Sequence, residues 1–310
     1  MSPYPLSAEL AAFVQRTLSY TSADSSVQAL RDSYERMCRD FTPVRAPGLA
    51  VHERQLAGVP LRFYHPDRAA PEGGWPWLLY LHGGGWVLGS LDSHDFITAH
   101  LASELQVLVI AVDYRLAPEH PFPAAFDDCL AVWRALEQGL GPAPLDRRRR
   151  LVMGDSAGGN LAAALCLALR DAGDPLPAAQ VLVYPGLGGG ADLPSRSQCA
   201  DAPLLSRSDL DGFQALYLPR PEQPSPYAWP LQAGDFSHLP TAFIALAQFD
   251  PLRDDGQCYH QRLLHAGVTS QLYPGLGLVH GCLRARGLAA EVDELYDALL
   301  RALRQCLEQP

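Results

Sequence analysis

The chain has 310 residues, of which 48% are hydrophobic and 19% are charged. This composition is typical of a globular protein with a sizeable core, and the length suits one large α/β domain or two ordinary ones. The formal net charge of −10 argues against a nucleic-acid-binding surface, which needs a basic stripe. The basic run Arg147–Arg150 precedes an apolar segment, a position that predicts a solvated loop.

The amino terminus and the cysteines bear on the location of the protein. Residues Met1–Leu6 lack the basic and apolar regions of a secretory signal, and no apolar run approaches the ~18 residues that span a bilayer. Seven cysteines without a C-x-x-C pair suit a reducing compartment better than a disulfide framework or a zinc site. We therefore expect a cytoplasmic protein without a membrane span.

The predicted elements begin with two helices, near Ser7–Leu18 and Ser26–Arg39. Two strands follow, Val51–Leu56 and Leu61–Tyr64, which are expected to pair antiparallel through Gly58. Further apolar strands then alternate with helices, which indicates a mostly parallel sheet covered by helices on both faces. The remaining strands are expected at Trp77–Leu81, Val107–Val112, Leu151–Met153, Val181–Tyr184, Phe243–Ala247 and Gln271–Tyr273, and the remaining helices at Ser93–Leu105, Ala124–Gln138, Leu161–Asp171, Gly256–His265 and Glu291–Cys306.

One long region interrupts this alternation. The segment from about Gly186 to Ser237 is rich in proline and glycine and contains one plausible helix, Asp209–Leu218. An irregular insertion of this length in a compact domain is more often a lid or binding element than a plain connection. We expect it to lie over the carboxyl ends of the strands, the edge of an open α/β sheet where ligands bind.

The segment Gly154-Asp155-Ser156-Ala157-Gly158 lies between a short apolar strand and a run of strong helix formers. It matches G-x-S-x-G, the nucleophile elbow of α/β-hydrolases. In such an elbow the serine adopts a strained backbone conformation, and glycines two residues away on each side avoid a collision. The pattern therefore predicts Ser156 as a nucleophile.

A serine nucleophile needs a base that a third group orients, and in this fold the order is Ser, then an acid, then His. Asp250 directly follows the strand Phe243–Ala247 and is the preferred acid, with Asp254 and Asp255 as competitors. His280 follows the next strand in a glycine-rich loop and is the preferred base.

A second glycine-rich loop supplies the expected oxyanion hole. His82-Gly83-Gly84-Gly85-Trp86 directly follows the strand Trp77–Leu81, as the HGGG-type loop of esterases does. We expect the backbone N–H groups of Gly83, Gly84 and Ala157 to bind an oxyanion, with Gly85 shaping the loop. His82 precedes the elbow, so we interpret it as a structural anchor and not as the base.

These motifs, together with the segment Val112–Ala125, Tyr184-Pro185, Phe249–Asp254 and His280-Gly281, resemble the hormone-sensitive-lipase-like carboxylesterases, bacterial family IV, of the α/β-hydrolase fold. The resemblance runs from about Val51 to the end. It implies an α/β-hydrolase catalytic domain over residues 46–310 with a cap or lid insertion at about 186–237, and an N-terminal helical cap region over residues 1–45. Two features depart from the family pattern: the loop before His280 is longer, and Cys282 replaces a common aromatic residue.

We therefore expect a serine carboxylester hydrolase that needs no cofactor or metal and acts through Ser156, Asp250 and His280 on small-molecule esters with short or medium acyl chains. Amidase, formamidase or deacetylase activity on the same fold is the alternative within enzymes. A receptor that binds a small molecule without hydrolysing it is another alternative, which the presence of His280 disfavours. No pattern marks a specific protein interface, so a monomer and a homodimer are both open.

Overall fold

The computed structural model describes residues 4–220 and 225–308, so part of the expected lid, residues 221–224, lies outside the described residues. An eight-stranded sheet runs through the molecule in the order β1-β2-β4-β3-β5-β6-β7-β8. The β1–β2 and β2–β4 pairs are antiparallel and the remaining pairs are parallel, which confirms the expected α/β-hydrolase architecture. The strands are β1 (Leu49–Leu56), β2 (Val59–Pro66), β3 (Trp75–Leu81), β4 (Leu108–Val112), β5 (Leu145–Asp155), β6 (Ala179–Val183), β7 (Thr241–Ala245) and β8 (Ser270–Tyr273).

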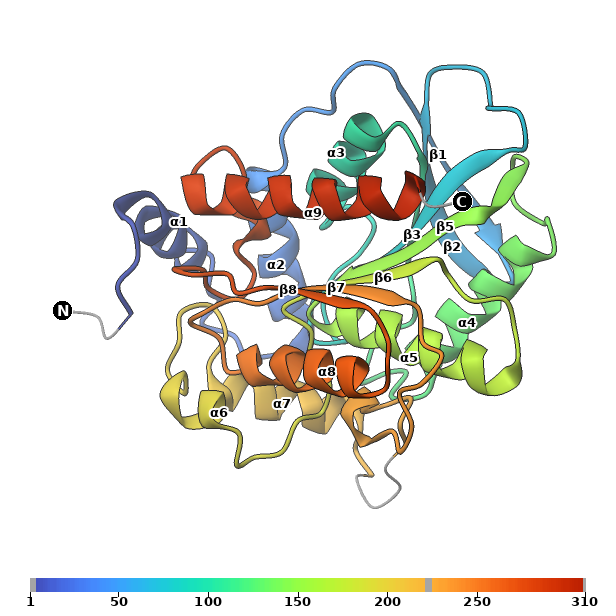
Figure 1. The fold of residues 1–310 in the computed structure, drawn as a ribbon. Helices are drawn as coiled ribbons and strands as arrows, with labels where there is room; N and C mark the ends of the chain where they lie inside the picture. The colour runs from blue at the N-terminus through green and yellow to red at the C-terminus, as the bar shows by residue number, and fades with distance from the viewer. Residues whose placement is uncertain (1–3, 221–224, 309–310) are drawn as a thin grey trace.

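Helices cover both faces of the sheet (Figure 1). One face carries α3 and α9, and the opposite face carries α4, α5 and α8. No helix within the described ranges combines the length and the apolar character needed to cross a membrane. The helices are α1 (Ala8–Leu18), α2 (Val27–Phe41), α3 (Asp95–Leu105), α4 (Ala124–Glu137), α5 (Ala157–Ala172), α6 (Pro194–Gln198), α7 (Arg207–Tyr217), α8 (Arg253–His265) and α9 (Ala290–Glu308), with short 3₁₀ turns η1 (Pro230–Gln232) and η2 (Cys282–Ala285).

The alternation of side chains along β3 divides the core into two layers. Trp77 and Leu79 pack into the layer under α4, α5 and α8, whereas Leu78 and Tyr80 pack into the layer under α3 and α9. Successive residues of a strand point to opposite faces, so a central strand covered on both sides must be apolar at every position. All seven residues of β3 are buried, as this rule requires.

The basic run Arg147–Arg150 is part of β5 and not a solvated loop, so that prediction is wrong. This end of β5 pairs with β3, where Leu145 lies opposite Trp75 and Arg150 lies opposite Trp77. The guanidinium of Arg150 is partly buried and bonds to Glu137 on α4 at 2.6 Å. The four arginines therefore belong to a paired strand, although their charge is typical of a loop.

The N-terminal helices and the segment 186–237 lie near the same edge of the sheet, where Figure 1 shows α1, α2, α6 and α7 on one side of the molecule. Ser7, Ser26 and Ser206 cap α1, α2 and α7, and each side chain accepts a backbone N–H of the first turn. Val27 and Leu30 of α2 and Phe213 of α7 pack around the loop that follows β3. Both segments are therefore attached to the sheet edge that carries this loop.

Candidate active site

Ser156 lies at the sharp turn between β5 and α5 and has φ 55° and ψ −117°. A non-glycine residue rarely adopts this conformation, and such strain is found mainly at functional sites. A Cβ on Gly158 would collide with the carbonyl oxygens of Leu81 and His82, and a Cβ on Gly154 would collide with the backbone of Gly158. The two glycines allow β3, β5 and α5 to approach closely enough to hold the serine in this turn.

Ser156, His280 and Asp250 form one hydrogen-bonded chain. The Oγ of Ser156 lies 2.9 Å from Nε2 of His280, and Nδ1 of His280 lies 2.7 Å from Oδ2 of Asp250. The other oxygen of Asp250 accepts the backbone N–H of Leu252 at 2.7 Å, and the carboxylate is fully buried. The three residues named from the sequence thus meet, although 124 positions separate the serine from the histidine.

The competing acids have other partners. Asp254 accepts the N–H of Ser195 at 2.8 Å and pairs with Arg253. Asp255 is fully buried, accepts the N–H of Leu187, and pairs with Arg196. Both carboxylates attach the segment after β6 to the start of α8, which is a structural use.

Backbone contacts hold the lengthened loop before His280. The N–H of Gln248 donates to the carbonyl of Gly275, and its side chain accepts the N–H of Gly277. Farther along, Phe249 and Val279 form an isolated parallel bridge that continues the β7–β8 pairing. The loop is therefore anchored on both sides of its glycines. Cys282, in the aromatic position of the family, is fully buried.

The loop after β3 differs from the expectation at one glycine. The N–H of Gly83 donates to Oδ1 of Asp155 at 3.0 Å, so this N–H already has an acceptor inside the protein. Gly84, Gly85 and Ala157 instead line the cavity beside Ser156. Gly84 has φ 124° and Gly85 has φ 61°, both of which favour glycine. Gly85, which was expected only to shape the loop, therefore lines the cavity, whereas the N–H of Gly83 is bound to Asp155.

His82 is packed in the interior next to this loop. Its ring stacks on Tyr114 with 4.2 Å between ring centroids, and the Tyr114 hydroxyl donates to the carbonyl of His82 at 2.6 Å. Burial lowers the pKa of His82 to about 3, so the ring is neutral at ordinary pH. The stacked ring and the bonded carbonyl of His82 together orient the start of the glycine loop.

Asp155, the variable residue inside the elbow motif, has a role that the motif does not reveal. Its buried carboxylate accepts the Tyr80 hydroxyl at 2.7 Å and lies 3.5 Å from Nε2 of His94. Burial alone raises the pKa of Asp155, but His94 and the hydrogen bond from Tyr80 more than offset this effect and bring the pKa to about 2. The carboxylate therefore ties the elbow to the glycine loop through Gly83.

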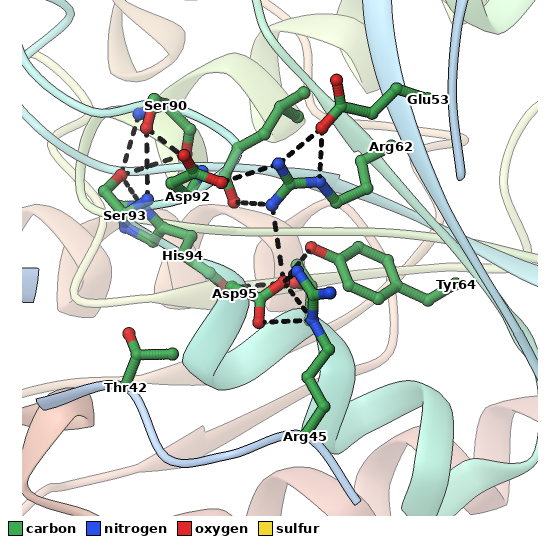
Figure 2. A network of polar contacts seen from close by, with 12 residues as sticks. Thr42, Arg45, Glu53, Arg62, Tyr64, Ser90, Asp92, Ser93, His94 and Asp95 are labelled. Atoms are coloured by element: carbon green, nitrogen blue, oxygen red, sulfur yellow. Dashed lines mark hydrogen bonds and ion pairs between the residues drawn. The ribbon is translucent and has the colours of Figure 1, made fainter. Parts of the chain in front are cut away.

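His94 belongs to a polar network, which Figure 2 shows. Oγ of Ser93 lies 2.8 Å from Nδ1 of His94. The adjacent Asp95 accepts the Tyr64 hydroxyl at 2.8 Å and pairs with Arg45 at 2.7 Å. Arg45 belongs to the segment that connects α2 to β1, so the network links the N-terminal helices to the residue that contacts Asp155.

A cavity of about 230 Å³ opens beside Ser156 and His280. Its walls come from the loop after β3, from α1 and α2, and from the segment 186–237, and most of them are apolar. Within the described part of the chain, no three His, Cys, Asp or Glu side chains gather as a metal site. The apolar lining residues include Leu18, Met37, Leu205, Leu210 and Phe213.

Comparisons with known proteins agree with this geometry. A family model described as the alpha/beta hydrolase fold matches residues 78–284. A carboxylesterase, NlhH, of Mycobacterium tuberculosis is 38% identical over 94% of this chain and 92% of its own length, and an ethyl acetate hydrolase of Pseudomonas putida is 38% identical over 84% and 82%. The crystal structure of an esterase from the bacterial hormone-sensitive lipase family superposes with a TM-score of 0.88, at 30% identity over 98% of this chain and 99% of that one.

The family model covers more than half of the chain, and the sequence relatives cover most of it. These comparisons confirm the resemblance that the glycine loop, the elbow and the later motifs indicated. The chain therefore belongs to the α/β-hydrolase family and, within it, to the carboxylesterases of the hormone-sensitive-lipase type.

Proposed function

We propose that this protein is a serine carboxylester hydrolase in which Ser156 is the nucleophile, His280 the general base and Asp250 the residue that orients the base. The observation that carries the proposal is the hydrogen-bonded chain from Ser156 Oγ through the imidazole of His280 to Asp250. A serine hydroxyl becomes an effective nucleophile when a base within hydrogen-bond distance accepts its proton.

The reaction then follows from the positions of these groups. His280 takes the proton of Ser156 through Nε2 as Oγ attacks the ester carbonyl, and the buried Asp250 stabilises the imidazolium that forms. The imidazolium next protonates the departing alkoxide, which leaves an acyl group on Ser156. A water molecule, deprotonated by the same imidazole, hydrolyses the acyl-enzyme and restores the serine.

The oxyanion of the tetrahedral intermediate needs N–H donors that have no other acceptor. We assign this role to Gly84, Gly85 and Ala157, and we withdraw Gly83 from the set because its N–H donates to Asp155. Ala157 begins α5, so its N–H lies at the positive end of the helix dipole, which favours negative charge.

The size and walls of the cavity bear on the substrate. A volume of about 230 Å³ with mostly apolar walls suits short or medium acyl chains better than long lipid chains. The walls contributed by α1, α2 and the segment 186–237 support the division into a cap region, residues 1–45, a catalytic domain, residues 46–310, and a lid insertion. These segments are then expected to set the acyl-chain preference.

The cysteines support the proposed location. All seven are free thiols, and five of them are buried. Free thiols persist in reducing compartments, so we propose that the enzyme works in the cytoplasm. The oligomeric state, a monomer or a homodimer, stays a prediction.

Hydrolysis of 4-nitrophenyl acetate and butyrate by Ser156→Ala tests the proposal. The variant should lose nearly all turnover, and phenylmethylsulfonyl fluoride should label Ser156 in the wild-type chain, as read by peptide mass spectrometry. Ser208→Ala, on an exposed position of α7, is the matched control and should keep wild-type rates. Wild-type turnover by a folded Ser156→Ala protein would refute the assignment.

A further inference from the structure

Arg284 is a buried arginine in the wall of the catalytic cavity. It lies on η2, four residues after His280, and lines the same cavity as Ser156. Only 9% of its surface is exposed. A guanidinium carries a full positive charge at any ordinary pH, so the wall of this mostly apolar cavity contains a cation beside the nucleophile.

The contacts of this guanidinium leave much of it unsatisfied. Nη1 lies 3.4 Å from the hydroxyl oxygen of Tyr34, and Cζ lies 5.5 Å from the centre of the Tyr34 ring. Nε has no hydrogen-bond partner among the described residues. These contacts with a neutral phenol are weaker than the charge-assisted bonds that a buried guanidinium normally makes.

The other buried arginines of this chain make the contrast clear. Arg62 pairs with Glu53 and Asp92, as Figure 2 shows, and Arg196 pairs with Asp255. Arg284 forms no ion pair with any carboxylate in the part of the chain that the structure describes. A buried charge without a partner is strongly unfavourable, so its counter-ion is expected to come from outside the chain.

No neighbour of Arg284 among the described residues supplies that charge through a direct ion pair. Burial raises the pKa of Tyr34 and of Tyr184 well above the ordinary value and that of Cys38 to about 12, so all three side chains are neutral. Asp155 also lines the cavity, but its carboxylate is occupied by the Tyr80 hydroxyl, the Gly83 N–H and His94.

We propose that the substrate of this enzyme carries a carboxylate in addition to its ester, and that Arg284 binds this carboxylate while Ser156 attacks the ester carbonyl. The planar guanidinium presents parallel N–H donors that match the two oxygens of a carboxylate. The carboxylate belongs either to the acyl part, as in a monoester of a dicarboxylic acid, or to the alcohol part, as in an acylated hydroxy acid. This proposal rests on the proposed esterase function.

Two pairs of esters distinguish a carboxylate in the acyl part from one in the alcohol part. Each pair consists of an anionic ester and a neutral ester in which an isopropyl group replaces the carboxylate. For the acyl side the pair is monomethyl succinate and methyl 4-methylpentanoate. For the alcohol side it is 3-acetoxypropanoate and 3-methylbutyl acetate. We expect the wild-type enzyme to prefer the anionic member of one pair about tenfold or more in kcat/KM, measured by pH-stat titration.

Variants at two arginines test whether Arg284 causes that preference. Arg284→Met keeps the length of the side chain without its charge and should abolish the preference, while Arg284→Lys should retain part of it. Because the readout is a ratio of two rates for one protein, partial inactivation of a variant does not affect it. Arg286→Met is the matched control and should keep the wild-type ratio, since Arg286 lines a different cavity, beside His100.

Calorimetric binding to Ser156→Ala repeats the comparison without turnover, so it still decides the proposal if Arg284→Met fails to fold. We expect this protein to bind the preferred anionic ester at least tenfold more tightly than its neutral counterpart. Turnover of the neutral esters with no preference for either anionic member would overturn the role of Arg284 and leave the esterase function intact. Loss of turnover on all four esters would contradict the esterase function, while the binding ratio would still test Arg284.

Discussion

Phe249 and Val279 form an isolated parallel bridge, and the residues that follow them, Asp250 and His280, are hydrogen-bonded to each other and are the proposed acid and base. The bridge sets these two chain segments side by side beyond the ends of β7 and β8. A long glycine-rich loop can therefore still present its histidine at a fixed position, because the residue directly before His280 is paired with the residue directly before Asp250.

Replacing Gly275 by Ala should disturb this arrangement. Gly275 has φ 58°, and a Cβ there would collide with the carbonyl oxygen of Leu246 just after β7. We expect Gly275→Ala to lower kcat for 4-nitrophenyl butyrate by tenfold or more and to reduce the free energy of unfolding by about 2–3 kcal/mol, which combines the positive φ with backbone displacement. Steady-state kinetics and urea unfolding measure the two effects.

Gly277→Ala provides the matched control for that variant. Gly277 lies two residues farther along with a similar φ of 76°, but an added Cβ meets no atom within 4 Å. We expect it to cost about 1 kcal/mol of stability, because only the backbone strain is introduced, and to keep kcat close to wild type. Equal effects of the two substitutions on kcat would argue against a specific role for the contact between Gly275 and Leu246.

Asp250→Asn should reduce kcat by about 10⁴ with little change in KM. The amide can still contact His280, but it favours the wrong tautomer and no longer stabilises the imidazolium. Asp254→Asn changes the carboxylate that bonds to Ser195 and Arg253, and it should leave kcat within about tenfold of wild type. A larger loss from Asp254→Asn than from Asp250→Asn would reverse the assignment of the acid.

Much of the fold could be predicted because its signals are local. The central strands are covered on both faces and must be continuously apolar, and helices such as α2 and α9 have one buried apolar face and one exposed polar face. α5 begins at Ala157 and not at Leu161, because the elbow turn leads directly into the helix although Gly158 and Gly159, which weaken helix propensity, lie in its first turn. The basic end of β5 is not recognisable from the sequence, because Arg150 bonds to the partly buried Glu137, a contact that depends on the position of α4.

The site divides in the same way. The proposed nucleophile, acid and base follow from a fixed order of motifs, each near the end of a strand. The buried position of Asp155 and the proposed role of Arg284 could not be found from the sequence, because they depend on contacts with Tyr80 and Tyr34, residues 75 and 250 positions away. The assignment of Gly83 failed for the same reason: its N–H is taken by Asp155, and no property of a glycine run reveals that acceptor.

Asp155→Asn should destabilise the protein and slow the reaction together. The buried carboxylate accepts the Tyr80 hydroxyl and the Gly83 N–H beside His94, and the amide replaces a negative charge with a donor against that ring. We expect the free energy of unfolding to fall by about 1–3 kcal/mol, the range for leaving a buried hydrogen-bonding group unsatisfied. We also expect kcat to fall more than KM rises, because the glycine loop loses its anchor.

Asp297→Asn, on an exposed position of α9, is the control for the change of Asp to Asn itself. Its free energy of unfolding should lie within about 0.5 kcal/mol of the wild-type value. Urea unfolding and initial rates with 4-nitrophenyl butyrate give both quantities. Unchanged stability in Asp155→Asn would mean that the carboxylate is not needed to join the elbow to the glycine loop.

The stability of the protein should fall as the pH falls below about 6.5. Burial lowers the pKa of His82 to about 3, and burial followed by the charge of Arg286 lowers the pKa of His100 to about 4. Between these values and the ordinary pKa of about 6.5, the unfolded chain binds protons that the folded chain does not, so acid favours unfolding. The stabilisation is complete above pH 6.5 and is lost toward pH 3–4. His82 contributes up to about 1.4 kcal/mol per pH unit, and His100, which solvent partly screens, contributes less.

Urea midpoints between pH 7.5 and 5 measure how steeply stability falls with pH, and His100→Gln should make this dependence shallower. A stability that does not change between pH 7.5 and 5 would mean that neither ring is held neutral by burial.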